Sequence, residues 1–261
     1  MSNEASIQGT LGEVLDRLSR DLGQFPRRVP GTLKIDGQPI VYSDLHSFFH
    51  QAYQIYVQKL YDLDTEKPIR SILDCGAHIG LASIYYAGRF PDAEIHGFEA
   101  DPELCQMASL NVRQLGLGNR IHLHPKAVWI DDNGIGFHRT GDDSGIVSNA
   151  GSVRVPSFSL RDWIEHHDVD LIKMDIEGAE YSVLKDCKDV LGSVPYVLIE
   201  AHQFGRNEGH LHEILAILSE AGFETGLGDF HPATWIPQHT SLPFKACPNK
   251  HFVITIFAWR E

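Results

Sequence analysis

Apolar positions near the start of the chain follow the spacing of a helix. A helix that ends at Gly23 is predicted by the apolar residues Leu11, Val14, Leu15, Leu18 and Leu22. A segment with proline-containing turns follows, in which the Asp-Gly pair at position 36 indicates a hairpin. A second helix is expected to run through Leu60. We therefore expect residues 1–66 to form a helical extension that covers the remaining domain, residues 67–261.

From about residue 69 the pattern changes to short apolar segments that alternate with amphipathic ones. The apolar segments predict strands over residues 71–75, 93–100, 120–128, 170–176, 195–201 and 251–259. The segments between them predict helices within residues 76–90, 101–115, 159–167, 177–187 and 210–223. Alternation of this kind is typical of βαβ units, and near-continuous apolar strands indicate a sheet covered on both faces. The predicted fold class is α/β with a mainly parallel sheet.

The acid excess of the chain narrows the classes of partner. Asp and Glu total 35 and Lys and Arg total 22, which gives a formal net charge of −13. Binding to nucleic acid or to an anionic membrane surface needs a clustered basic face, so we expect neither partner. The apolar runs are too short to span a bilayer, no signal peptide is recognisable, and the four cysteines form no CxxC pair. We therefore expect a soluble, cytoplasmic protein with reduced thiols.

A glycine-containing loop follows the first strand of the predicted sheet, where parallel sheets bind ligands. It reads D-C-G-A-H-I-G over residues 74–80, in which Gly76 permits a tight turn and Gly80 lets the next helix pack closely. The dinucleotide fingerprint G-x-G-x-x-G fails, because His78 and Leu81 replace its second and third glycines. The loop therefore suits a nucleoside ligand that lacks a pyrophosphate, and Asp74 could attract a cationic group. S-adenosylmethionine has these properties.

An acid at the tip of the second strand supports this interpretation. Glu99 follows Asp74 by 25 residues, and an acid at that place can accept hydrogen bonds from both ribose hydroxyls. The alternative is a solvated acid at a strand end. An oxidoreductase that uses NAD is a weaker hypothesis, because the loop lacks the glycine that approaches a pyrophosphate.

Three segments resemble the FkbM family of S-adenosylmethionine-dependent methyltransferases. They are ILDCGAHIG (residues 72–80), GFEADP (residues 97–102) and KMDIEGAE (residues 173–180), and the resemblance covers about residues 69–203. It implies a class I methyltransferase fold, which is Rossmann-like and has a mainly parallel seven-stranded sheet whose last strand is antiparallel, with helices on both faces. It also implies methylation of hydroxyl groups on natural products or sugars.

The resemblance also implies roles for single residues on the cofactor side. Asp74, Gly76 and Gly80 would form the cofactor loop, and Glu99 would bind the ribose. Ala127, with the neighbouring valine, would lie against the adenine. His78 would either contact the methionine carboxylate or cap the following helix, and both readings remain open. Asp131 and Asp132 could reach the adenine amino group, but we expect them to be turn acids.

Acidic and histidine side chains follow the fourth and fifth predicted strands, at Asp175, Glu200 and His202. A hydroxyl acceptor must lose its proton during methyl transfer, and a histidine has a suitable pKa for that base. We expect these three residues to be catalytic; Asp175 could be the base, orient His202, or hold the substrate hydroxyl, and it also borders the cofactor. Glu177 would contact the substrate together with His202. Glu180 is expected to be a helix-dipole or salt-bridge acid, and Lys173 to pair with an acid below the cofactor.

Several alternatives remain open from the sequence. The acids and the histidine could ligate Mg²⁺ or another divalent metal, but a D-D-x-N motif is absent, so we expect no metal. Asp143 is expected to contact the acceptor from a polar loop, residues 138–152, which could be a lid or only a connection. The acceptor is expected to be a small hydroxylated molecule. A small amine, a non-catalytic cofactor-binding module and a homodimer formed through aromatic side chains of the extension are the alternatives.

Overall fold

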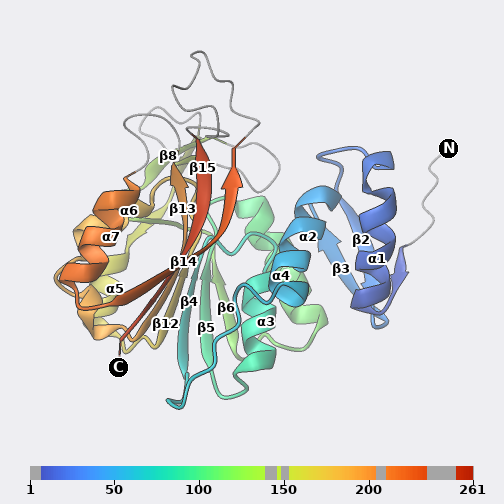
Figure 1. The fold of residues 1–261 in the computed structure, drawn as a ribbon. Coiled ribbons are helices and arrows are strands. Elements are labelled where there is room, and N and C mark those ends of the chain that lie inside the picture. The colour runs from blue at the N-terminus through green and yellow to red at the C-terminus, as the bar shows by residue number, and fades with distance from the viewer. Residues whose placement is uncertain (1–6, 139–145, 148–152, 204–209, 234–250, 261) are drawn as a thin grey trace, which may run out of the picture.

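The computed structural model describes residues 7–138, 146–147, 153–203, 210–233 and 251–260. Its centre is a seven-stranded sheet in the order β14-β15-β13-β12-β4-β5-β6 (Figure 1). Its strands are β4 (Ser71–Cys75), β5 (Glu94–Phe98), β6 (Ile121–His124), β12 (Leu171–Met174), β13 (Tyr196–Gln203), β14 (Glu224–Pro232) and β15 (Phe252–Trp259). Strand β15 is antiparallel to both of its neighbours, and the other adjacent pairs are parallel. The expected class I methyltransferase sheet, with its last strand antiparallel, is confirmed.

Helices cover both faces of this sheet, as expected. On one face lie α3 (Leu81–Arg89) and α4 (Pro102–Gln114), and on the other lie α5 (Leu160–His166), α6 (Glu180–Cys187) and α7 (Leu211–Glu220). Alternate residues of a strand enter different cores: Ile72 packs in the cluster that contains Tyr86 of α3, whereas Leu73 packs in the cluster that contains Val183 of α6. This alternation explains why the central strands are apolar at nearly every position.

The N-terminal extension contains a small sheet as well as helices. Its elements are β1 (Gln8–Gly9), α1 (Leu11–Asp21), η1 (Leu22–Gln24), β2 (Gly31–Ile35), β3 (Gln38–Tyr42), α2 (Leu45–Ala52) and the π-helical turn η2 (Tyr53–Val57). The predicted hairpin is present, and Asp36 has the positive φ of a tight turn. The prediction of one helix through Leu60 was too long, because the α-helix ends at Ala52 and only the π-helical turn continues it.

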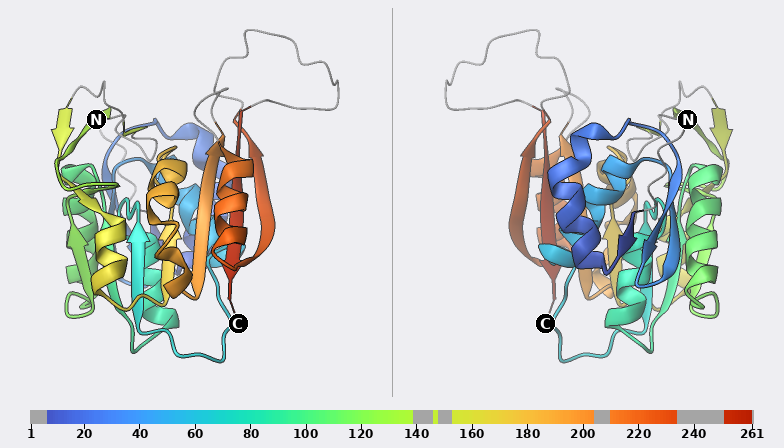
Figure 2. Two further views of the ribbon diagram at one scale, coloured as in Figure 1. Left: turned by 90° about the vertical axis from the view of Figure 1, so that its left-hand side faces the viewer. Right: turned by 90° about the vertical axis from the view of Figure 1, so that its right-hand side faces the viewer.

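The extension packs on the face of the sheet opposite to α5, α6 and α7, as the two side views show (Figure 2). Its apolar side chains, such as Leu18 and Phe48, belong to the same core cluster as Ile72 of the sheet. The buried side chain of Asn111 in α4 joins the two parts: its amide bonds both backbone groups of Val41 and the carbonyl of Ile79. Residues 7–57 are therefore anchored to the glycine-loop side of the domain.

Two strand predictions need correction. The strand expected over residues 120–128 is interrupted at Pro125, which lacks an amide proton for the ladder. Its second part, β7 (Ala127–Trp129), pairs with β11 (Ser157–Ser159) instead, and β8 (Ile135–His138) pairs with β9 (Ile146–Val147) and β10 (Val153–Val155). Strand β14 was not predicted from the pattern, because it lies at the sheet edge with Leu227 and Phe230 exposed and contains two glycines.

Two further expectations concern the whole chain. Within the described residues, no helix has both the length and the apolar character needed to cross a membrane. Cys75, Cys105 and Cys187 are buried and free, and Cys247 lies outside the described residues.

The glycine at the start of the loop generates a test of the fold. Gly76 has φ +83°, and a Cβ there would overlap the backbone oxygen of Asp175. We expect Gly76→Ala to lower the free energy of unfolding by at least about 2 kcal/mol, because the residue would be strained and would push β12 away. Urea unfolding monitored by circular dichroism measures this change.

Gly88→Ala is the matched control. Gly88 lies in α3, and apart from its chain neighbours and the backbone of its own helix no atom lies within 4 Å of an added Cβ. Alanine there should therefore leave stability unchanged or raise it by up to about 1 kcal/mol. Equal effects of the two substitutions would contradict this account of the loop.

Candidate active site at the carboxyl ends of the parallel strands

The glycine loop is held by backbone hydrogen bonds to the neighbouring strand. The amides of Gly76 and Ala77 both donate to the carbonyl of Phe98, each at 2.9 Å. Gly76, His78 and Gly80 have positive φ values of 83°, 49° and 87°, so the chain turns sharply three times before α3 begins. Since only glycine adopts this conformation without strain, the glycines at both ends of the loop are required by its shape.

Glu99 lies at the tip of β5 and binds the loop directly. Its carboxylate accepts hydrogen bonds from the amides of His78 and Asp101, each at 2.8 Å. Burial raises the pKa of Glu99 to about 7, although these two hydrogen bonds lower it. Each carboxylate oxygen has a second lone pair and can accept one more hydrogen bond. Glu99 is therefore a buried strand-end acid next to the loop, not a solvated one.

Asp74 lies beneath the loop and has no exposed surface. Its carboxylate accepts a hydrogen bond from Ser83 Oγ at 2.6 Å and lies 3.3 Å from Lys173 Nζ. This enclosure gives Asp74 a supporting position under the loop.

Lys173 connects the ends of β4 and β12. Its Nζ donates to the carbonyl of Gly76 at 2.7 Å and lies 3.6 Å from Asp175 Oδ2, in addition to its contact with Asp74. Burial alone would lower the pKa of Lys173, but Asp74, Asp175 and Glu200 together raise it above its ordinary value, so the ammonium stays charged. The expected pairing of this lysine with an acid below the loop is present.

His202, at the end of β13, lies among several carboxylates. Its Nδ1 is 3.0 Å from Glu180 Oε1, and its Nε2 is 3.5 Å from Glu177 Oε2 and 3.9 Å from Asp175 Oδ1. Glu180 also accepts hydrogen bonds from the amides of Ile176 and Gly178, which hold its carboxylate in place. Burial opposes a charged imidazole, yet Glu177 and Glu180, followed by Asp175, raise the pKa of His202 well above its ordinary value.

Glu200 completes this group, which we call the carboxylate–histidine cluster (Asp175, Glu177, Glu180, Glu200 and His202). Burial and the charge of Asp175 raise the pKa of Glu200 to about 8. Ligand atoms of Asp175, Glu200 and His202 lie within 4.8 Å of one another. Oxygen and imidazole donors at this spacing could hold a divalent cation as well as handle a proton.

The other predicted residues occupy different surroundings. The ring of His78 points toward the extension: Nδ1 is 2.9 Å from Gln51 Oε1, and Nε2 is 3.4 Å from Ser43 Oγ. The N-cap of α3 is Gly80, which has no side chain, and both ring nitrogens of His78 contact the extension. Ala127 is buried in the cluster under β8 and β10. Asp143 lies outside the described residues.

Two turn acids behave as expected. Asp131 accepts a hydrogen bond from the amide of Asn133 at 2.8 Å, and Asp132 accepts one from the amide of Ser159 at 3.0 Å. The link from His78 to Gln51 was missed, because nothing in the sequence indicates that the extension meets the loop. Glu180 was expected to be a helix-dipole or salt-bridge acid, but the sequence did not identify its partner His202, which lies 22 residues further along the chain.

Comparison with known proteins decides the family. The family model described as the methyltransferase FkbM domain matches residues 74–225, which is more than half of the chain. The chain belongs to the FkbM methyltransferase family. The expected family and enzyme class are thereby confirmed, and the hypotheses of an NAD-dependent oxidoreductase and of a non-catalytic module are set aside.

Individual relatives of this FkbM-family methyltransferase are distant. The chain is 26% identical over 170 residues to 2-O-methyltransferase NoeI of Sinorhizobium fredii, covering 56% of this chain and 69% of that protein. It is 25% identical over 228 residues to methyltransferase sdnD of Sordaria araneosa, covering 72% and 86%. The crystal structure of methyltransferase FkbM from Methylobacillus flagellatus KT superposes with a TM-score of 0.52 and 21% identity, over 81% of this chain. This chain spans half of that protein, and the likeness shows the fold.

The buried ion pair of this FkbM-family enzyme generates a prediction for stability. Lys173→Met should lower the free energy of unfolding by about 3 kcal/mol, because it leaves Asp74 buried without its cation. The double variant Lys173→Met/Asp74→Asn should recover part of this loss, since it removes the second charge too. Guanidinium unfolding of the two variants measures both effects.

Lys126→Met is the control, because Lys126 is an exposed lysine near the same end of the sheet. It should change stability by less than about 0.5 kcal/mol. A loss from Lys173→Met no larger than that of the control would show that the buried pair does not hold the strand ends together.

Proposed function

We propose that this enzyme transfers a methyl group from S-adenosylmethionine to a hydroxyl of a small molecule, such as a natural product or a sugar. The observation that carries the proposal is His202, which Glu180 orients and which lies beside Asp175 at the strand ends facing the glycine loop. The name of the relative NoeI, a 2-O-methyltransferase, also supports a hydroxyl acceptor.

The residues present fit S-adenosylmethionine chemically. The loop from Gly76 to Gly80 offers turned backbone, and Glu99 offers two buried carboxylate oxygens for the ribose hydroxyls. The carboxylate–histidine cluster contains four acids but one histidine, with Lys173 beside it. Such an excess of negative charge stabilises a nearby cation.

When bound, S-adenosylmethionine supplies a methyl carbon activated by its sulfonium charge. The work left for the protein is to align the acceptor, to exclude water and to accept one proton. In our proposal His202 Nε2 takes the hydroxyl proton, and Glu180 holds the ring through Nδ1 and stabilises the imidazolium that forms. Asp175 and Glu177 lie next to Nε2 and can hold the acceptor hydroxyl in line.

The setting of the reaction is part of the proposal. Free, buried cysteines are typical of a reducing compartment, which favours the cytoplasm. The net charge of −13 disfavours nucleic acid as the acceptor. A homodimer stays a prediction.

Cofactor binding is tested first, at Glu99. Glu99→Gln should weaken the binding of S-adenosylhomocysteine by about 10- to 100-fold, because hydrogen bonds from ribose to a carboxylate contribute about 1.5–3 kcal/mol. Isothermal titration calorimetry measures the affinity. Glu103→Gln, a change of the same type on the first turn of α4, is the control and should leave the affinity unchanged.

A wild-type protein that does not bind S-adenosylhomocysteine would overturn the cofactor assignment. Equal affinity of Glu99→Gln and wild type would remove Glu99 from the ribose site. Release of S-adenosylhomocysteine, measured across a panel of hydroxylated small molecules, then tests for the acceptor.

The proton step is tested by pH. Because the acids around His202 raise its pKa, the imidazole is protonated at neutral pH and becomes a base only as the pH rises through that value. We therefore expect kcat/KM to keep increasing as the pH rises beyond neutrality, and the proton resonance of His202 in NMR titration to report a pKa above the ordinary 6.5. Glu180→Gln removes one of the charges that raise this pKa, so it should shift both curves toward lower pH.

His202→Gln should reduce kcat by about 100-fold or more, since general-base catalysis contributes about that factor. A loss of less than tenfold would favour an amine acceptor, which needs little base catalysis. EDTA treatment should leave the rate unchanged, and a loss restored by added Mg²⁺ or Mn²⁺ would instead assign the cluster to a metal.

A further inference from the structure

The N-terminal extension contacts the glycine loop at the residue that holds the proposed ribose acid. Gln51, on the last turn of α2, has its Oε1 2.9 Å from Nδ1 of His78. Ser43 has its Oγ 3.4 Å from Nε2 of the same ring. Since an amide oxygen can only accept, Nδ1 donates the hydrogen bond to Gln51. The ring of His78, which is 6% exposed, is thus held at both nitrogens by groups of the extension.

The same histidine holds Glu99 through its backbone. The amide of His78 donates to Glu99 Oε2 at 2.8 Å, whereas the amide of Asp101 donates to Oε1. The direction of the His78 amide depends on its φ angle, which is 49° and lies in the left-handed region. A residue with a side chain is strained there and keeps this conformation only where its surroundings impose it. The contacts of the ring with the extension are such a constraint.

The helix that presents Gln51 is itself fixed. Phe48 and Ala52 of α2 have no exposed surface. Asp44 caps the first turn by accepting a hydrogen bond from the amide of Ser47 at 3.1 Å. Because α2 cannot shift without disturbing these buried groups, Gln51 meets the loop from a defined position.

A second link joins the following loop residue to the extension. Nδ2 of Asn111 donates to the carbonyl of Ile79 at 3.0 Å, and the same side-chain amide bonds both backbone groups of Val41 in β3. Two successive loop residues are therefore tied to residues 41–51. The family model matches residues 74–225, so this support comes from a part of the chain that the model does not match.

We propose that Gln51 is a positioning residue for the cofactor. Through the ring of His78 it fixes the backbone amide that holds the Glu99 carboxylate toward the ribose hydroxyls, and it does not itself touch the cofactor. This inference rests on the proposed function, because it takes Glu99 as the acid that binds the ribose. Its consequence is that the extension controls the affinity for S-adenosylmethionine.

The test measures the affinity of the full chain for S-adenosylhomocysteine by isothermal titration calorimetry, well below the Tm of every variant. Gln51→Leu removes the acceptor oxygen and nearly preserves the size of the side chain. It should weaken binding by about 3- to 10-fold, which is the net contribution of one hydrogen bond. Gln58→Leu, the same change at an exposed position just after η2, is the control and should leave the affinity unchanged.

A conservative variant tests for rescue. Gln51→Glu keeps an oxygen that can accept the hydrogen bond from Nδ1 of His78. It should therefore bind S-adenosylhomocysteine more tightly than Gln51→Leu does. No recovery in Gln51→Glu would contradict the role of this hydrogen bond.

A double-mutant cycle separates positioning from a general effect on folding. If Gln51 acts through Glu99, the variant Gln51→Leu/Glu99→Gln should bind about as weakly as Glu99→Gln alone. The same holds for His78→Asn, since asparagine tolerates the left-handed conformation but is too short to reach Gln51. Adding Gln51→Leu to His78→Asn should then change the affinity no further. A residue that only stabilises the fold would lower Tm and leave the affinity of the folded protein unchanged.

The outcomes distinguish this inference from the proposed function. Failure of wild type to bind S-adenosylhomocysteine would overturn the proposed function, and this inference with it. If wild type binds, equal affinity of Gln51→Leu and wild type would overturn the positioning role alone. Additive losses in the two cycles would also overturn it, because Gln51 would then act by a route that does not pass through His78 and Glu99.

Discussion

The buried ammonium of Lys173 is the interaction on which the arrangement of the strand ends depends. It joins the glycine loop, through the carbonyl of Gly76, to the acids Asp74 and Asp175 on two neighbouring strands. A charge taken out of water is costly unless it is paired and hydrogen-bonded, so these groups have few other arrangements open to them. The loop and the end of β12 are consequently held at a fixed separation, with Gly76 against the backbone of Asp175.

At these strand ends, the acids of the carboxylate–histidine cluster outnumber the nearby cationic side chains. Glu177, Glu180 and Asp175 surround a single histidine, and Glu200 lies beside them with a raised pKa. Repulsion of this kind is a cost to the free protein. A cationic cofactor would relieve it, which is the physical reason to expect S-adenosylmethionine at this edge of the sheet. The same acids also set the basicity of His202, because the negative charges that would attract a cation raise the pKa of this histidine.

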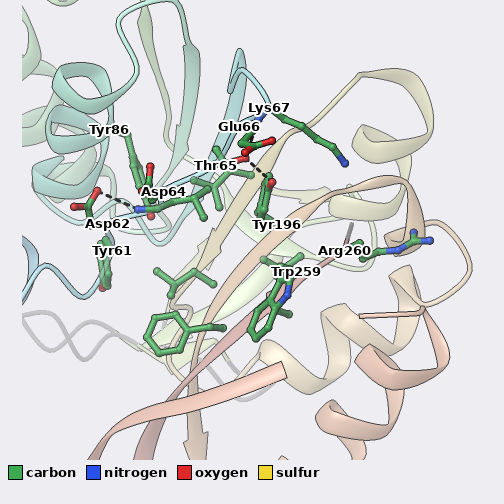
Figure 3. A pocket seen from close by; sticks show the side chains of 16 residues that line it. Tyr61, Asp62, Asp64, Thr65, Glu66, Lys67, Tyr86, Tyr196, Trp259 and Arg260 are labelled. Atoms are coloured by element: carbon green, nitrogen blue, oxygen red, sulfur yellow. Dashed lines mark hydrogen bonds between the residues drawn. The ribbon is translucent and has the colours of Figure 1, made fainter. Parts of the chain in front are cut away.

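The elements on the two faces of the sheet support different parts of the site. Helices α5, α6 and α7 pack against one face and place Glu180 under His202, whereas the N-terminal extension packs against the other and meets the loop through His78. On that second face, Tyr86 and residues 61–67 also border a cavity at the amino end of β13 (Figure 3). The same extension thus contacts the glycine loop at one end of the sheet and covers the opposite end.

The sequence by itself determined the order of strands and helices, the glycine loop and the family. Apolar periodicity and turn residues are local signals, and short motifs such as KMDIEGAE keep their spacing wherever they lie. It also placed Asp175 and His202 at strand ends. The pairing of β7 with β11 instead of with the main sheet was decided only in three dimensions, after Pro125 ended the ladder. The edge strand β14 was likewise recognised only in the structure, because its sequence shows no alternation of apolar and polar residues.

Tertiary structure alone decided the partners. Glu180 meets His202 across 22 residues, His78 meets Gln51 across 27, and Lys173 meets the loop across 97. No periodicity encodes such contacts, because they depend on how separate elements pack and on which buried charges must be compensated. The sequence supplied the chemical groups, and packing decided which of them share a site.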